Sequence, residues 1–179
     1  MVKHLVFDTE TTGLIRNTLV MLDKQPEIFE FFGVSVDMDT LELGEELHVF
    51  AKPSKKMDEG AKKATGKDES FFVDFKPFSE SAQRIKECIE NHDAVVAHNL
   101  MYDFNVMKFE FKRLGMEIKW PRLICTIEKT EHVKGYRLSN TDLYKHLFPG
   151  EDFDGKHEAR NDVLALARSY VELVKRGII

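Results

Sequence analysis

The sequence predicts an α/β fold in which a mixed β-sheet is flanked by α-helices. Segments with the character of strands come early in the chain, segments with helical periodicity come later, and the two kinds are mixed in between. The chain has 179 residues, of which 42% are apolar and 14 are phenylalanine, enough for one packed core. It contains no repeat, low-complexity segment or linker. We therefore expect a single domain over residues 1–179.

Four segments are predicted to be strands. Residues 3–8 (KHLVFD) carry a continuous rather than alternating apolar run, which is typical of a strand buried on both faces. Residues 27–37 and 43–51 form two further candidates, and the turn at 37–40 joins them. Residues 93–98 (DAVVAH) form another buried strand, between helical segments.

Helical spacing of apolar residues marks the later part of the chain. The predicted helices lie within residues 78–92, 103–114, 138–148 and 157–176. In the second of these, Phe104, Met107 and Phe111 form one stripe that is expected to face the core. Ser139 or Asn140 is predicted to cap the third helix, and Gly66 is predicted to close a short helix in the preceding loop region.

Composition and charge exclude several classes of protein. The net charge of −5 argues against a protein that coats nucleic acid by charge alone. Cys88 and Cys125 have no paired spacing, which indicates a reducing compartment and no zinc site. No apolar stretch approaches the ~18 residues that span a bilayer, so we expect a cytoplasmic protein without a membrane partner. Residues 51–70 carry six lysines against four acids, as in a solvated loop or a surface that faces nucleic acid.

Asp8 and Glu10 are the first candidate functional residues. Residues two apart on a strand point to the same side, so both carboxylates project together from the end of the first strand. They repel each other, and burying either one without a partner is costly. Taken alone, the pair is weak evidence for a metal site and favours a capping or solvent-facing pair.

Asp103, His157 and Asp162 complete the candidate set. Asp103 stands at the start of a predicted helix, where it serves either a site or the helix N-terminus itself. Asp162 directly precedes the apolar run of a buried helix. Five residues advance a helix by about 500°, so the side chains of His157 and Asp162 would lie about 140° apart on one helix. His157 therefore reaches the same site only from the loop or the first turn. That placement suits a base better than a rigid ligand, and the alternative is a surface histidine in a charged loop.

Four carboxylates and one histidine at the edges of buried elements indicate a coherent chemistry. Oxygen ligands without cysteine favour Mg²⁺ or Mn²⁺. Four carboxylates approximately neutralise two divalent cations, which would offset the repulsion between Asp8 and Glu10. Two such ions about 4 Å apart can hold the attacking and leaving oxygens of an in-line phosphoryl transfer. The sequence therefore predicts metal-dependent chemistry on a phosphate ester.

Three short motifs resemble those of a known family. FDTETTGL (7–14), AHNLMYDF (97–104) and HEARND (157–162) are similar to the motifs of the DEDDh subgroup of the DnaQ-like 3′–5′ exonucleases. The H-x4-D spacing of the third motif separates this subgroup from the one that uses a tyrosine. The resemblance spans nearly the whole chain and implies a ribonuclease H-like fold with a central mixed five-stranded sheet. The chain departs from the family pattern at Cys125, where many members carry aspartate, and in a longer segment at 15–25.

The resemblance also implies a catalytic role for each of the five residues. Asp8, Glu10, Asp103 and Asp162 would hold two Mg²⁺ or Mn²⁺ ions. Neutral His157 would take a proton from a water bound to one of these ions, and the resulting hydroxide would attack the terminal phosphodiester. The expected product is a 5′-mononucleotide.

Substrate contacts are implied for Thr11, Thr12, Gly13, Leu14 and Asn99. Thr11 and the backbone near Thr12 would bind the terminal 3′-hydroxyl, and Asn99 would lie near the substrate backbone. Leu14 would either wedge against the terminal base or pack in the core. The expected substrate is the single-stranded or frayed 3′ end of DNA or RNA, and a DNA polymerase is a further candidate partner.

Two other hypotheses are compatible with parts of the sequence. A phosphatase of the haloacid dehalogenase type also opens with an apolar strand followed by DxDxT, from which VFDTETT differs by one methylene. That chemistry has no use for HEARND. The second hypothesis is a catalytically silent module that binds nucleic acid or tethers a polymerase, and the five filled catalytic positions argue against it.

Overall fold

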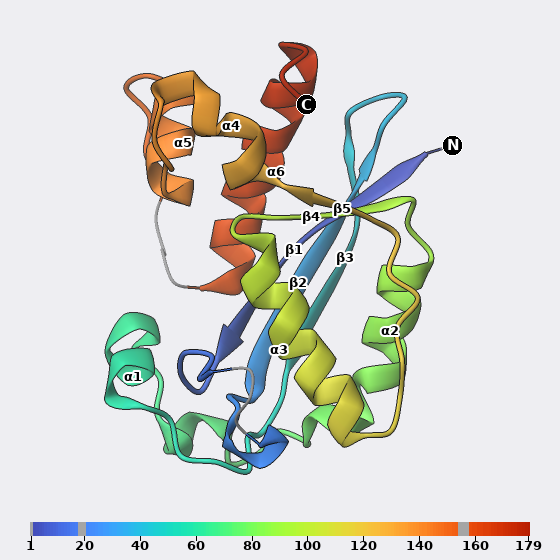
Figure 1. The fold of residues 1–179 in the computed structure, drawn as a ribbon, viewed down its shortest axis with the longest axis vertical. Coiled ribbons are helices and arrows are strands. Elements are labelled where there is room, and N and C mark those ends of the chain that lie inside the picture. Colours follow the sequence, from blue (N-terminus) through green and yellow to red (C-terminus); the bar gives the residue numbers. More distant parts are fainter. Residues whose placement is uncertain (1, 18–20, 154–157) are drawn as a thin grey trace.

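The computed structural model describes residues 2–17, 21–153 and 158–179. Its centre is a five-stranded sheet in the order β3-β2-β1-β4-β5, with helices on both faces (Figure 1). The strands are β1 (Lys3–Thr11), β2 (Ile28–Asp37), β3 (Leu43–Phe50), β4 (Ala94–Ala97) and β5 (Arg122–Cys125). The first three strands pair antiparallel, whereas β4 and β5 run parallel to β1. The predicted mixed five-stranded sheet is confirmed.

The central strand β1 has both faces covered. Leu5 and Phe7 face one side of the sheet and Val6 faces the other, and all three are fully buried. The pairing of β1 with β2 shifts register between Glu10 and Thr11. The regular ladder therefore ends immediately after the two carboxylates, which places them at an irregular edge of the sheet.

The helices divide between the two faces of the sheet. They are α1 (Glu59–Thr65), α2 (Ala82–Glu90), α3 (Leu100–Arg113), α4 (Thr126–Lys134), α5 (Asn140–Leu147) and α6 (Ala159–Lys175). On one face α2 and α3 bury Ile85 and Met107 against Leu5 and Phe7. On the other face α6 covers β1 and β2, while α5 packs against the outer side of α6. Figure 1 shows α3 crossing in front of the sheet and the α4–α5 pair beside α6.

The predicted strands and helices are found within a few residues of their expected bounds. Ser139 caps α5, because its hydroxyl accepts a hydrogen bond from the Asp142 N–H at 3.1 Å. Gly66 ends α1 in the left-handed conformation, with φ of 67°. In the stripe predicted on α3, Met107 and Phe111 are buried as expected.

Three features of the later chain differ from the sequence analysis or were not predicted. β5 has only four residues, and two of them are exposed, so it leaves little hydrophobic pattern. α4 buries Thr126 and Thr130 rather than an apolar stripe, which conceals its periodicity. Phe104 is only half-buried and lies at the edge of a surface groove, not in the core. Within the described ranges, no helix is both long and apolar enough to cross a membrane.

Candidate active site

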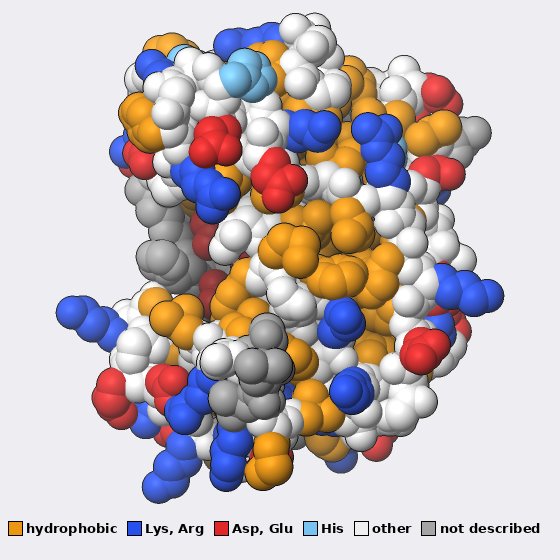
Figure 2. All heavy atoms as spheres, viewed as in Figure 1, with side chains coloured by type: hydrophobic (Ala, Val, Ile, Leu, Met, Phe, Trp, Pro, Cys, Tyr) orange, Lys and Arg blue, Asp and Glu red, His pale blue; other side chains and the backbone are white. Residues whose placement is uncertain are grey.

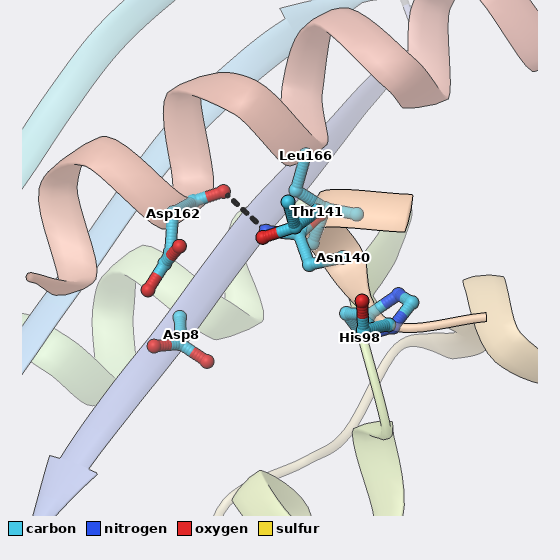
Figure 3. Close-up of a pocket in the computed structure, with 7 residues that line it drawn as sticks. Asp8, His98, Asn140, Thr141, Asp162 and Leu166 are labelled. Carbon is cyan, nitrogen blue, oxygen red and sulfur yellow. Dashed lines mark hydrogen bonds between the residues drawn. The ribbon is translucent and has the colours of Figure 1, made fainter. Parts of the chain in front are cut away.

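Three elements bring acidic side chains together beyond the end of β1. Asp8 and Glu10 project from this strand, and both are substantially withdrawn from solvent. Asp162 lies in the first turn of α6. Figure 3 shows the Asp162 side chain extending from α6 toward Asp8 on β1. The acidic pocket that these two residues line has a volume of about 240 Å³.

Asp103 enters the same site from the opposite side, in the first turn of α3. Its carboxylate accepts two hydrogen bonds from Thr9, one from the N–H at 3.0 Å and one from the hydroxyl at 2.7 Å. Asp103 is only 2% exposed. The carboxylate therefore does more than favour the helix N-terminus, because its contacts fix α3 to the middle of the acidic strand.

Burial and mutual repulsion shift the proton affinities of these acids. Burial raises the pKa of Asp8 well above its ordinary value, and the neighbouring carboxylates, Asp103 foremost, raise it further. Burial likewise raises the pKa of Glu10 to about 8, with the charges of Glu30 and Asp162 adding to the effect. Burial raises the pKa of Asp103 to about 7, against the hydrogen bonds that its carboxylate accepts. Such shifts are typical of functional sites.

A fifth carboxylate, Glu30, lies beside this group but has its own partners. It is paired across the β1–β2 ladder with Glu10. Its carboxylate is 2.9 Å from His48 Nε2 and 3.5 Å from Lys67 Nζ. By contrast, no hydrogen bond or ion pair within the described part of the chain involves the carboxylate of Asp8 or Glu10. Asp8 and Glu10 thus lack a direct partner, and only the more distant charge of Lys67 offsets part of the repulsion at Glu10.

The loop that follows β1 is held tightly against α1. Thr11 donates a hydrogen bond from its hydroxyl to the Gly13 carbonyl, and its hydroxyl also lies 2.5 Å from the Tyr102 hydroxyl. The Asp58 N–H donates to the Thr12 carbonyl. A Cβ at Gly13 would lie 2.2 Å from an Asp58 side-chain oxygen, so a larger residue here would require the Asp58 side chain to move.

Leu14 and Asn99, two of the predicted substrate contacts, are both exposed. Leu14 is 79% exposed, which excludes the alternative that it packs in the core. Asn99 precedes α3 in the left-handed conformation, with φ of 67°. Asparagine tolerates that conformation better than most residues. His157, the predicted base, lies outside the described residues, and its placement stays a prediction.

The sequence analysis missed several residues that line the acidic pocket. They are His98, Ser139, Asn140, Thr141 and Leu166. The Asn140 side-chain amide donates to the Asp162 carbonyl at 3.0 Å, a bond drawn in Figure 3. His98 bonds to the Thr126 hydroxyl at 2.9 Å and to the Leu138 carbonyl at 3.0 Å. His98 follows a buried strand inside the second motif, and this was the one signal that could have identified it.

A sheet of this topology with buried acids at the end of its central strand defines a ribonuclease H-like nuclease fold. The nuclease domain of 3′hExo, a DEDDh family member solved with rAMP, has this fold, with a TM-score of 0.78 and 14% identity. That match covers 98% of this chain and 93% of the other. Exonuclease X, solved with 5′ overhanging duplex DNA, gives a TM-score of 0.71 and 19% identity, covering 97% and 93% of the two chains.

The RNase_T exonuclease family model matches residues 5–170, so the chain belongs to this exonuclease family, the DnaQ-like DEDDh group that its motifs predict. A relative is the DNA polymerase III subunit epsilon of Escherichia coli (strain K12), 27% identical over 168 residues. The match covers 94% of this chain and 60% of that protein, so the chain spans less than two thirds of the relative's length. The phosphatase hypothesis is therefore wrong.

The acidic site fits the divalent metal ions on which this family depends. Its donors are hard carboxylate oxygens, and the described chain supplies no partner for those of Asp8 and Glu10. Among residues 2–17, 21–153 and 158–179, no three His, Cys, Asp or Glu side chains are already arranged to hold one ion. The acids therefore lie near one another without forming a complete coordination site for a metal ion in the described residues.

Proposed function

We propose that the chain is a 3′–5′ exonuclease that hydrolyses the terminal phosphodiester of a DNA or RNA strand and releases 5′-mononucleotides. The observation that supports this proposal is the convergence of acids from β1, α3 and α6 within an exonuclease-family fold. Asp8, Glu10, Asp103 and Asp162 would hold two divalent cations, Mg²⁺ or Mn²⁺. When bound, such ions activate water and stabilise charge on the reacting phosphate.

The chain's own residues supply orientation and proton transfer. Thr9 holds the Asp103 carboxylate through two hydrogen bonds, which fixes the angle between α3 and β1 at the reacting centre. Asn140 fixes the backbone of Asp162 on the other side of the pocket. His157 would accept the proton of the attacking water, as the motif spacing predicts. Burial raises the pKa of Asp8 in the folded chain, so protons and cations would compete for this carboxylate.

The rim of the site would seat the 3′ end. Leu14 presents an exposed apolar surface that can pack against the terminal base. Thr11, Thr12 and Gly13 form the tight loop beneath it, and their backbone would contact the 3′-hydroxyl. Asn99 would approach the substrate backbone from the start of α3. A stop of this kind limits cleavage to chain ends.

A single-stranded or frayed 3′ end of DNA or RNA is the proposed substrate, as the family resemblance of the three motifs implies. The relative in Escherichia coli is a DNA polymerase subunit. We therefore include a DNA polymerase as a candidate partner of this chain.

Digestion of labelled oligonucleotides tests the proposal. Single-stranded DNA, duplex DNA and RNA, each labelled at the 5′ end, are incubated with Mg²⁺, Mn²⁺ or EDTA. We expect a ladder that shortens by one nucleotide per step with either ion and no cleavage in EDTA. The Asp8→Ala variant is the control for a contaminating nuclease. Wild-type rates in that variant, or binding without metal-dependent cleavage, would refute the proposal, and the latter outcome would favour the silent binding module.

A further inference from the structure

An aromatic groove runs along the outer side of α3, separate from the acidic pocket. Its volume is about 650 Å³. Phe104, Phe109 and Trp120 line it together with Lys108 and Lys112. Figure 2 shows hydrophobic side chains gathered over this side of the molecule, with basic side chains beside them and acidic side chains deep in a neighbouring hollow.

The aromatic rings of the groove remain partly accessible. The ring centroids of Phe104 and Trp120 are 4.8 Å apart, and the Lys108 ammonium lies 5.5 Å from the Phe104 ring centroid. Phe104, Phe109 and Trp120 are each only partly buried. Proteins bind single-stranded nucleic acid with aromatic rings interleaved with cationic side chains, because the bases stack on the rings while the phosphates contact the cations.

The charges of the groove favour a phosphate-bearing occupant. Lys108 and Lys112 are exposed, and neither forms an ion pair with any residue that the structure describes. One carboxylate, that of Glu117, also lines the groove. An apolar protein segment laid here would desolvate two ammonium groups against the single carboxylate of Glu117. A nucleic acid strand supplies phosphates for the lysines and bases for the rings.

Phe104, the first groove residue on α3, directly follows Asp103 of the acidic site in sequence. Asp103 and Phe104 are consecutive on α3, so their side chains point about 100° apart, the first toward β1 and the second into the groove. Phe104 and Lys112 are eight residues apart, which spans ~12 Å along the helix. That length accommodates about three bases at the ~3.4 Å rise of a stacked strand.

We propose that this groove binds the nucleotides upstream of a 3′ end that is seated at the acidic pocket. Bases stack on Phe109 and Trp120, and the strand's phosphates contact Lys108 and Lys112. The inference rests on the proposed exonuclease function, and it adds a second site that favours longer single strands over dinucleotides.

Trp120 is the only tryptophan of the chain and reports on the groove directly. Its fluorescence is titrated in EDTA with oligothymidylates of two to twelve nucleotides. We expect quenching that strengthens with length up to about five nucleotides. The double variant Lys108→Gln/Lys112→Gln should bind about tenfold more weakly and lower the slope of log K against log salt by about 1–2. The matched control Lys134→Gln/Lys175→Gln removes the same charge from α4 and α6 and should bind as the unmodified chain does.

Cleavage assays with Mn²⁺ separate this inference from the proposed function. The Lys108→Gln/Lys112→Gln and Phe109→Ala variants should lose about tenfold in kcat/KM on an octanucleotide and nothing on a dinucleotide. If the unmodified chain cleaves but the variants show no larger loss on the octanucleotide than on the dinucleotide, the proposed groove is refuted and the proposed function is not. Oligonucleotides that leave Trp120 fluorescence unchanged would also overturn it and would favour a protein occupant. Quenching without any cleavage would refute the proposed function, and with it the placement of the groove upstream of a 3′ end.

Discussion

Glu30 lies directly opposite Glu10 across the β1–β2 pair, yet only Glu30 has a cationic partner within ion-pair distance. Lys67 reaches it from the segment after α1, and its side chain is only 12% exposed. His48 contacts the other carboxylate oxygen from β3. The buried acids are therefore of two kinds, those compensated by the protein and those left for a ligand from solution.

Replacing Lys67 should destabilise the fold by leaving Glu30 with one partner fewer. We expect Lys67→Gln to lower the free energy of unfolding by about 2 kcal/mol, less than for a fully buried pair because His48 remains. Adding Glu30→Gln in the same chain should restore most of that loss. Urea denaturation of the two single variants and the double variant measures the coupling. Strictly additive effects would contradict the pairing.

Neutralising Asp8 should stabilise the metal-free chain. Asp8 is buried among other carboxylates, so Asp8→Asn removes repulsion and is expected to add on the order of 1–3 kcal/mol to the free energy of unfolding in EDTA. Thermal unfolding in EDTA and in excess Mn²⁺ provides the measurement. Mn²⁺ should raise the Tm of the unmodified chain by more than that of the variant. A lower Tm for Asp8→Asn in EDTA would show that the carboxylate is compensated.

The metal-free chain should lose stability as pH rises from about 5 to about 8. The folded-state pKa values of Glu10 and Asp103 are raised to about 8 and about 7. Their ordinary values are 4.5 and 3.8. The folded chain therefore binds more protons than the unfolded chain in this window, and that stabilisation disappears as the folded-state groups ionise. Unfolding in EDTA at stepped pH tests this, and Glu10→Gln/Asp103→Asn should flatten the profile.

Truncating Leu14 should impair catalysis without affecting the fold. Because Leu14 is 79% exposed, Leu14→Ala should change the free energy of unfolding by less than about 0.5 kcal/mol. Loss of apolar contact with the terminal base should lower kcat/KM about tenfold, equivalent to ~1.4 kcal/mol. Val73→Ala is the matched control, since Val73 is also exposed but lies after the helical turn Glu69–Phe72. Equal kcat/KM for both variants would remove Leu14 from the substrate site.

Replacing His157 should separate proton transfer from metal binding. We expect His157→Ala to lower kcat by about 10²–10⁴ while the Mn²⁺-induced rise in Tm is retained. Asp8→Ala should lose both. If His157→Ala weakens metal binding as much as Asp8→Ala does, His157 is a ligand and not the base.

The sequence predicted those parts of the fold and site that depend on local pattern. The apolar run before Asp8 gave a buried strand, and the period of two placed Glu10 on the same side. Asp103 and Asp162 were identified because each stands where a buried helix begins. β5 and α4 were missed, because one is short with two exposed residues and the other buries threonines.

Long-range partners could not be deduced in this way. Nothing local in the sequence indicates that Lys67 pairs with Glu30, 37 positions away, or that Asn140 bonds to Asp162. These contacts arise only when the sheet brings distant segments together. The same holds for Phe104, which was predicted to be core. Its ring lies at the surface beside Trp120, in the groove along α3.

His98 connects both ends of the segment that contains α4. One ring nitrogen bonds to Thr126 at its start, and the other bonds to Leu138 just before α5. α5 then rests on α6 through Leu143, Leu147 and Leu173. The segment between positions 126 and 138 is therefore fastened at its two ends by a single imidazole. We expect that loops of other lengths can replace this segment while the sheet and its acids stay in place, provided that His98 and its two hydrogen-bond partners are kept.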